Sequence, residues 1–207
     1  MKSIIIAGPG RYGKTTLARK INEKFGCFII NLDKLMTTFD RAYPQLDVRI
    51  AWDYDNATAN VAPFIGHYLG MFSSHHGYAG DLNLHKHNES GNRFVLEGGH
   101  FDFKKISDIY NTYGVGELKD NFILIGLAQN TKTAKELAAT IRKHDTEDEW
   151  TYDFSDEALL ALCEDMVLHS QEMYNSMIKH GFTIYDTTTE RETVFEEIIK
   201  DINLRSV

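Results

Sequence analysis

The feature that most constrains the fold is a glycine-rich stretch close to the N-terminus, Gly8–Thr15, which reads GPGRYGKT. It fits the pattern G-x-x-x-x-G-K-[ST] at every fixed position. An apolar run, Ser3–Ala7, precedes it and a helical pattern follows from Thr15, which is the strand–loop–helix context that a phosphate-binding loop requires. Glycines let backbone N–H groups point inward at an anion, and the helix N-terminus adds positive potential there. The stretch therefore predicts a nucleotide-phosphate site.

The residue types within this loop have separate chemical roles. We expect Lys14 to reach the β- and γ-phosphates of ATP and the Thr15 hydroxyl to bind Mg²⁺. Lys14 is therefore a candidate catalytic residue, and Thr15 is a candidate metal ligand. The residues expected to bind the cofactor ATP are Gly8, Pro9, Gly10, Arg11, Tyr12, Gly13, Lys14, Thr15 and Thr16.

Short apolar runs alternate with helical patterns along the rest of the chain. The runs show little polar alternation, which is typical of strands buried on both faces of a parallel sheet. Such alternation implies right-handed crossovers and helices on both faces. The pattern predicts one α/β domain over residues 1–207, a three-layer P-loop fold with a five-stranded parallel sheet flanked by helices. The expected strands are Ser3–Ala7, Cys27–Asn31, Arg93–Glu97, Asn121–Leu127 and Thr183–Asp186, and the expected helices are Thr15–Phe25, Thr58–Ser73, Thr131–His144, Asp156–His180 and Glu190–Asn203.

Two segments fit this alternation less well. Asp33–Asp55 is mixed, and we expect a helix at its start followed by a loop. Ser74–Asn92 is polar, glycine-containing and without a pattern, which is typical of a functional or mobile loop. Its four histidines lack the spacing of the helical H-E-x-x-H metal motif, so a solvated loop is the favoured interpretation; they are His75, His76, His85 and His87.

A second acidic group is needed beside a phosphate loop to hold Mg²⁺, usually through water. The run that ends Phe94-Val95-Leu96-Glu97-Gly98 offers Glu97 at the end of a predicted strand. The rival is Asp186, at the end of the last predicted strand, and the alternative is that Glu97 only terminates its strand. Glu97 is the second candidate metal ligand.

Composition excludes several classes of function. A net charge of −8 and a pI near 5.6 argue against a nucleic-acid binder held by a general basic face. The longest apolar runs are too short to span a bilayer, and the N-terminus lacks the apolar stretch of a signal peptide. The two cysteines are too few for a disulfide framework. We therefore expect a cytoplasmic protein that has neither a nucleic-acid nor a membrane partner.

These motifs together resemble a known family. The N-terminal phosphate loop, the step Asn31-Leu32-Asp33 after the second strand and Leu96-Glu97-Gly98 on the third resemble P-loop small-molecule kinases of the nucleoside and nucleotide kinase superfamily. The Leu-Glu-Gly step is more similar to uridine-kinase-type enzymes than to adenylate kinase. The adenylate kinase pattern has an arginine shortly after its Asp-Gly pair, whereas this chain has Gly98–Asp102, GGHFD. That departure disfavours a nucleoside monophosphate as acceptor.

The resemblance also implies a short helical lid, here about residues 142–153, after the helix predicted at Thr131–His144. Arg142 then falls where the family carries a lid arginine over the transferring phosphoryl group, so it is a candidate catalytic residue. The alternative is an arginine that interacts favourably with the dipole at a helix C-terminus. The residues that follow, Asp145–Glu149, are mostly acidic.

Asp33 occupies the position where related sugar, nucleoside and antibiotic kinases keep a carboxylate near the acceptor hydroxyl. A carboxylate that orients the hydroxyl and takes its proton late suffices for phosphoryl transfer, so Asp33 is the third candidate catalytic residue. The alternative is a helix N-cap, for which Asp is also suited. The acceptor-binding insertion is expected at about residues 34–92. Its candidate wall residues, which include one residue beyond the insertion, are Arg41, Arg49, Trp52, Tyr54, His67 and His100.

The function that these expectations favour is transfer of the γ-phosphate of ATP, with Mg²⁺, to a hydroxyl of a small-molecule acceptor, with a nucleoside as one candidate. Two alternatives stay open: a nucleoside monophosphate kinase, and a nucleotide-binding regulatory ATPase. The identity of the acceptor, the choice between ATP and GTP, and the oligomeric state, with a homodimer as one option, are also left open.

Overall fold

A computed structural model of the chain describes residues 1–50, 53–73, 93–129, 133–147 and 149–205. Five strands form one all-parallel sheet in the order β2-β3-β1-β4-β5, which confirms the predicted fold class. The first and last strands have the predicted bounds, and each of the others differs by one residue at one or both ends. The strands are β1 Ser3–Ala7, β2 Phe28–Asn31, β3 Phe94–Gly98, β4 Phe122–Ala128 and β5 Thr183–Asp186.

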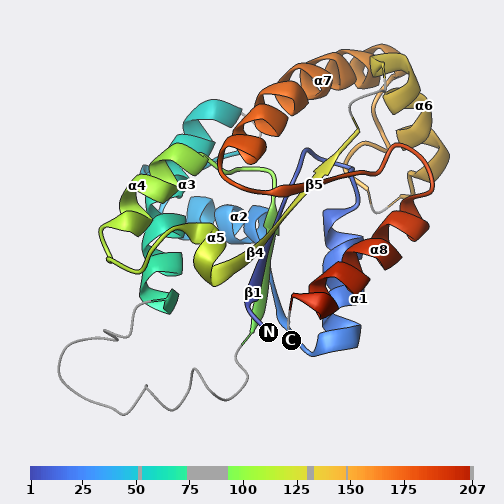
Figure 1. The fold of residues 1–207 in the computed structure, drawn as a ribbon. Coiled ribbons are helices and arrows are strands. Elements are labelled where there is room, and N and C mark those ends of the chain that lie inside the picture. The colour runs from blue at the N-terminus through green and yellow to red at the C-terminus, as the bar shows by residue number, and fades with distance from the viewer. Residues whose placement is uncertain (51–52, 74–92, 130–132, 148, 206–207) are drawn as a thin grey trace.

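Helices cover both faces of this sheet and make three layers (Figure 1). Alternating residues of β1 divide the core: Ile5 packs in a cluster with α2, α3 and α4, whereas Ile4 and Ile6 pack with α1, α6, α7 and α8. This is the two-sided burial that a parallel sheet requires. The helices are α1 Lys14–Phe25, α2 Leu32–Ala42, α3 Tyr54–Ser73, α4 Phe103–Asn111, α5 Leu118–Asn121, α6 Ala134–His144, α7 Asp156–Lys179 and α8 Arg191–Leu204, with a short 3₁₀ turn at Pro44–Leu46.

Sequence patterns missed two of these helices and misplaced the start of a third. The α4 helix is capped by the Asp102 side chain, which accepts the N–H of Lys105, and α5 is a single turn of four residues. The α3 helix begins at Tyr54 rather than Thr58. Nine- and four-residue helices span too few turns for a convincing apolar period, so they escape detection.

The α3 and α4 helices approach closely at glycine. A Cβ on Gly66 of α3 would lie 2.8 Å from Cβ of Ile109 on α4 and 3.1 Å from the carbonyl oxygen of Ile106. Both neighbours are backbone or next to it, so neither can move aside cheaply. This packing fixes the position of α3, whose N-terminal end places Tyr54 and Thr58 against Gly99 and His100, just after β3.

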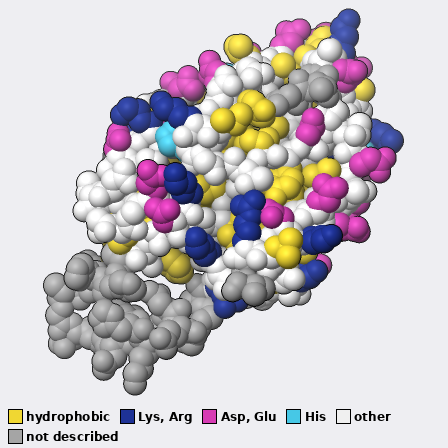
Figure 2. Space-filling model, viewed as in Figure 1, with side chains coloured by type: hydrophobic (Ala, Val, Ile, Leu, Met, Phe, Trp, Pro, Cys, Tyr) yellow, Lys and Arg dark blue, Asp and Glu magenta, His cyan; other side chains and the backbone are white. Residues whose placement is uncertain are grey.

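On the face shown in Figure 2, lysine and arginine side chains are interspersed with aspartate and glutamate rather than gathered into one basic field. No helix within the described ranges is long and apolar enough to cross a membrane. Both cysteines, Cys27 and Cys163, are buried free thiols.

Candidate active site

The phosphate loop joins β1 to α1, and at two of its positions the backbone conformation or the space available favours glycine. Gly13 has φ 92°, and a Cβ there would lie 2.9 Å from the ring of Phe195. A Cβ on Gly8 would lie 2.7 Å from the carbonyl oxygen of Leu127. These two contacts explain in packing terms why the fixed glycines of the motif stand at positions 8 and 13.

Lys14 is the first residue of α1 and lies folded back over the loop. Its side chain is buried, and Nζ donates a hydrogen bond to the carbonyl oxygen of Pro9 at 2.7 Å. Burial lowers the pKa of Lys14, and the charges of Asp33 and Glu97 oppose that shift. The structure therefore brings the predicted lysine and both predicted carboxylates into one electrostatic group.

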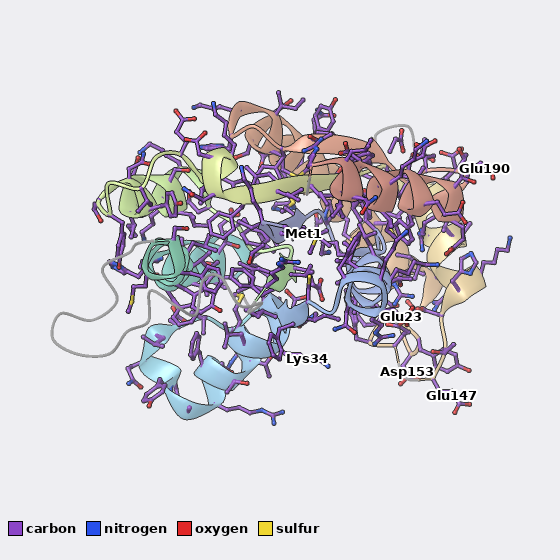
Figure 3. All side chains as sticks on the ribbon, turned by 60° about the horizontal axis from the view of Figure 1, so that its bottom comes forward. Met1, Glu23, Lys34, Glu147, Asp153 and Glu190 are labelled. Atoms are coloured by element: carbon purple, nitrogen blue, oxygen red, sulfur yellow. The ribbon has the colours of Figure 1, made fainter. Side chains whose placement is uncertain are left out.

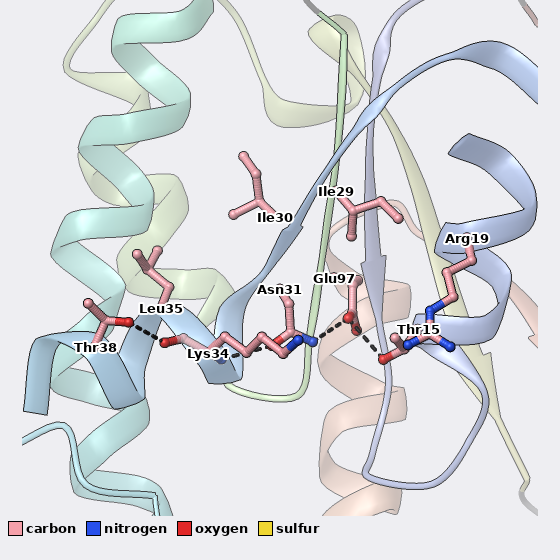
Figure 4. Close-up of a pocket in the computed structure, with 9 residues that line it drawn as sticks. All are labelled: Thr15, Arg19, Ile29, Ile30, Asn31, Lys34, Leu35, Thr38 and Glu97. Atoms are coloured by element: carbon pink, nitrogen blue, oxygen red, sulfur yellow. Dashed lines mark hydrogen bonds between the residues drawn. The ribbon is translucent and has the colours of Figure 1, made fainter. Parts of the chain in front are cut away.

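Glu97, near the end of β3, lies at the centre of a hydrogen-bonded group of three side chains (Figure 4). Oε1 of Glu97 accepts from Thr15 Oγ1 at 2.9 Å and from Asn31 Nδ2 at 2.5 Å. Asn31 is the register partner of Glu97 across β2 and β3, which is why the two side chains meet. The Glu97 side chain is almost wholly buried, and a buried carboxylate needs such donors or a cation.

The Thr15–Glu97 pair suits Mg²⁺ by its donor chemistry. Mg²⁺ prefers hard oxygen ligands and is usually held by one or two protein groups together with substrate phosphates. The rival carboxylate, Asp186, is exposed and accepts hydrogen bonds from the backbone and hydroxyl of Thr188. Within the described residues, no group of three or more His, Cys, Asp and Glu side chains could hold a metal ion. A magnesium site here would therefore depend on nucleotide oxygens as well.

Asp33 lies in the first turn of α2, immediately beyond this group. Loss of hydration raises the pKa of Asp33, while the Lys14 charge and a hydrogen bond from the Gly99 backbone oppose the rise. The N-cap of α2 is Asn31, whose side-chain oxygen accepts the N–H of Lys34 at 2.8 Å. The alternative that Asp33 caps this helix is wrong, because the helix begins at Leu32 and its N-cap is Asn31, two residues before Asp33.

Two of the predicted acceptor-side residues, Tyr54 and His100, pack against each other beside Asp33. The Tyr54 hydroxyl donates to the carbonyl oxygen of Gly99 at 2.5 Å, and the ring centroids of Tyr54 and His100 are 4.4 Å apart. Burial and the charge of Asp33 raise the pKa of Tyr54 to about 12. Burial and the charge of Lys14 lower the pKa of His100 to about 4, so the imidazole is neutral at pH 7.

Sequence reasoning missed the neighbours of this pair. Oγ1 of Thr58 lies 2.8 Å from Nδ1 of His100, and the ring of His169 on α7 lies 5.3 Å from that of Tyr54. The sequence pattern predicts only that Thr58 begins a helix, and it indicates no functional role for this residue. His169 lies more than 100 residues from Tyr54 along the chain, and only the tertiary fold brings these two rings together.

The other candidate wall residues take separate positions. Arg49 bonds the carboxylate of Asp40, and Nδ1 of His67 lies 2.9 Å from the Tyr113 hydroxyl. Arg41 is exposed in the last turn of α2. Trp52 lies outside the described residues, as do the four histidines of 74–92.

Arg11 and Arg142 both contact the connection between α6 and α7, whose described part consists of turns and extended backbone. Arg11 forms ion pairs with Asp145, at 2.6 Å, and with Glu149. The Arg142 guanidinium donates to backbone carbonyls of this connection and pairs with Asp156 at its end; the carbonyls are those of Thr151, Tyr152 and Phe154. The contacts of Arg142 are thus made within the connection, whereas Arg11 links it to the phosphate loop.

The far side of the loop rests on the ends of β4 and β5. Oγ1 of Thr187 lies 3.3 Å from the carbonyl oxygen of Tyr12, and Gln129 Nε2 donates to Thr187. Arg191, at the start of α8, packs beside Gly13, and its burial together with the Arg11 charge lowers the pKa of Arg191. These contacts fix the loop between two strands and a helix.

Comparisons with known proteins bear on the fold of the chain. No protein-family model and no curated protein sequence matches the chain. Among solved structures, the chain is similar to a shikimate kinase from Bacteroides thetaiotaomicron, with a TM-score of 0.54, 14% identity and coverage of 100% of this chain and 99% of that one. It is also similar to a gluconokinase from Sinorhizobium meliloti 1021, with a TM-score of 0.50, 12% identity and coverage of 100% and 98%.

The chain therefore has the three-layer α/β fold that these P-loop small-molecule kinases share, over its whole length. At such low identity the likeness concerns the fold, and the chemistry has to be argued from the site.

Proposed function

We propose that the protein is an ATP- and Mg²⁺-dependent phosphotransferase that moves the γ-phosphate to a hydroxyl of a small metabolite. The observation that carries this proposal is the meeting of three predicted residues: Lys14 in the phosphate loop, with Asp33 and Glu97 close enough to shift its pKa. A phosphate-binding cation, a candidate metal carboxylate and a candidate base are the groups that phosphoryl transfer needs.

The phosphate side of the reaction rests on α1 and the loop before it. Residues 8–16 would surround the ATP phosphates with backbone N–H groups, and the N-terminus of α1 would add positive potential. Nζ of Lys14 now bonds Pro9 within the loop. It would exchange that carbonyl for β- and γ-phosphate oxygens and stabilise the charge on the transferring group.

Thr15 and Glu97 would hold Mg²⁺, Thr15 directly and Glu97 through water. When bound, the ion would neutralise charge on the β- and γ-phosphates. Asn31 is an addition to the predicted site, because its amide holds Oε1 of Glu97 in place. The same amide side chain caps α2, so the metal side and the acceptor side share one anchor.

Asp33 would orient the acceptor hydroxyl and take its proton late in the transfer. Its raised pKa makes the ionised carboxylate a better proton acceptor than that of an ordinary aspartate. Tyr54 and His100 would form one wall of the acceptor pocket, within the insertion proposed at about residues 34–92 and just beyond it. A neutral His100 beside an ionised Asp33 suits an acceptor that presents a hydroxyl.

The connection at about residues 142–153 would act as the lid. Arg11 already ties its start to the phosphate loop through Asp145, and Arg142 holds its backbone together. Arg142 would reach the transferring phosphoryl group only by leaving these carbonyls. We therefore propose Arg11 as the nearer cation and Arg142 as the lid arginine. Closure over the site would exclude water and suppress hydrolysis of ATP.

The proposal is tested by ADP release with Mg-ATP and a panel of nucleosides, sugars, hydroxy acids and nucleoside monophosphates. Release stimulated by a hydroxyl-bearing acceptor supports a small-molecule kinase. Stimulation confined to monophosphates would favour a nucleoside monophosphate kinase. Release that no acceptor changes would favour a regulatory ATPase and overturn the proposal.

A further inference from the structure

A cavity of about 510 Å³ adjoins the phosphate loop on the side of edge strand β2 (Figure 4). It lies between α1 and α2, which contribute Arg19 and Lys34 respectively. Its apolar wall comes from Ile29, Ile30 and Leu35. Neither Lys14 nor Asp33 lines it, so this cavity is distinct from the acceptor site proposed above, although it shares Thr15 and Glu97 with the metal side.

Two cationic side chains enter this cavity from opposite sides. In Figure 4, Arg19 reaches down from α1 and Lys34 extends across from the start of α2, with Glu97 between them. Both side chains are exposed. No described carboxylate forms an ion pair with either of them, although the chain carries 30 acidic residues and 22 lysines and arginines.

Glu97 offsets only one of these two positive charges. Its Oε1 is taken by the Thr15 hydroxyl and the Asn31 amide, and it forms no ion pair with Arg19 or Lys34. Arg19 and Lys34 against the single charge of Glu97 leave the lining of the cavity net positive. An anion there would gain charge-assisted hydrogen bonds from both side chains, and Arg19 offers a planar fork for a carboxylate or phosphate.

We infer that this cavity binds a small organic anion, whose carboxylate or phosphate group lies between Arg19 and Lys34. The carbon skeleton of the ligand would cover Ile29 and Leu35, which form apolar wall beside the charged mouth. A site of this kind needs both elements, a few placed polar groups and an apolar lining. The ligand would also lie against Thr15 and Glu97, so its binding would affect the two residues proposed to hold Mg²⁺. The inference does not depend on the proposed kinase activity.

The test is calorimetric titration of two probes, succinate for the carboxylate and glycerol 3-phosphate for the phosphate. The full chain carrying Lys14→Ala is the background, because that change disables the anion site of the phosphate loop itself. Binding that weakens at least tenfold on adding either Arg19→Gln or Lys34→Gln supports the inference, and the probe that binds assigns the head group. Lys24→Gln, on an exposed turn of the same α1 helix, is the matched control.

Absence of binding by both probes, or binding that survives both substitutions, would overturn the inference. A second measurement uses the unmodified protein, so that a misfolded variant cannot decide the matter. Backbone amide resonances are followed during the same titrations. Shifts concentrated in residues 29–38 and near Arg19 support the site, and shifts confined to residues 8–16 show that the phosphate loop alone takes the anion.

Discussion

The guanidinium of Arg11 in the phosphate loop lies 2.6 Å from the carboxylate of Asp145, directly after α6. The Asp145 side chain is only 3% exposed, and it also accepts a hydrogen bond from the Thr151 hydroxyl. A residue expected to meet ATP phosphate is therefore already paired with a carboxylate from the proposed lid. Figure 3 shows Glu147 and Asp153 projecting from the outer corner of this same connection, whereas Asp145 lies inward against Arg11.

Replacing Asp145 by Asn removes the more buried of the two charges that pair with Arg11 and keeps an acceptor for Thr151. We expect the free energy of unfolding to fall by about 1–3 kcal/mol, because a largely buried arginine loses its carboxylate. The affinity for ATP should rise several-fold, since Arg11 becomes available to phosphate. Denaturant unfolding and nucleotide titration measure the two effects. The control is Glu149→Gln, at the more exposed partner of Arg11, which should lose less stability. A loss for Asp145→Asn no larger than the loss for Glu149→Gln would argue against a buried Arg11–Asp145 pair.

Replacing Glu97 by Gln tests the metal side. The amide keeps the shape of the side chain but loses the negative charge that would attract Mg²⁺ through water. We expect the Mg²⁺ concentration for half-maximal ADP release to rise by about tenfold or more. Asp186→Asn, at the rival carboxylate, should leave that concentration unchanged. The opposite pattern, with Asp186 sensitive and Glu97 insensitive, would move the metal site to the end of β5.

Replacing Asp33 by Asn tests the proposed base. We expect the turnover rate with the acceptor to fall by about 10²–10⁴-fold, with little change in nucleotide binding. In the unmodified protein, the rate should rise with pH through a pKa above the ordinary aspartate value, because burial raises the pKa of Asp33 and the base acts when ionised. A pH–rate profile checks the position of this limb. A fall in rate limited to weaker ATP binding would exclude the role.

The raised pKa of Asp33 also predicts how the stability of the fold depends on pH. The folded-state pKa of Asp33 is raised, so this carboxyl loses its proton at a lower pH in the unfolded chain than in the folded protein. Ionised Asp33 therefore costs stability once the pH exceeds the folded value, and its cost vanishes below the unfolded value. Above its folded-state pKa, Asp33→Asn should melt at a higher temperature than the unmodified protein, with the difference shrinking toward pH 3. A variant that melts lower than the unmodified protein over that whole range would contradict the raised pKa.

Replacing Gly66 by Ala tests the packing that presents Tyr54 and Thr58. The added Cβ would lie 2.8 Å from Cβ of Ile109, so α3 and α4 would have to separate. We expect a loss of about 1–3 kcal/mol in the free energy of unfolding, against the small gain that Gly to Ala usually brings inside a helix. Thermal unfolding measures the change. A more stable variant would show that the two helices separate freely.

Much of the fold could be predicted from the sequence because its signals are local. The strand bounds follow from uninterrupted apolar runs such as Phe122–Ala128, and the phosphate loop from fixed residues between a strand and a helix. The ends of α7 also carry local signals, because serine is a preferred N-cap and glycine a preferred C′ residue. The Ser155 side chain accepts the N–H of Ala158, and Gly181, two residues after the helix, has φ 81°.

The site was only partly predictable, since much of it depends on contacts between distant segments. Lys14, Asp33 and Glu97 were found by motif and strand position. The role of Asn31 depends on the register of β2 against β3, and a local sequence pattern does not predict the register between two strands. The contacts of His169 with Tyr54 and of Asp145 with Arg11 join residues more than 100 positions apart. The roles of Arg142 and of the lid stay predictions.

The most direct test of the account follows the labelled phosphate of [γ-³²P]ATP after incubation with Mg²⁺ and the acceptor that stimulates ADP release. The account predicts label on the acceptor hydroxyl with the unmodified protein, and essentially none with Lys14→Ala or Asp33→Asn. Label found only in inorganic phosphate, or undiminished transfer by Lys14→Ala, would contradict it.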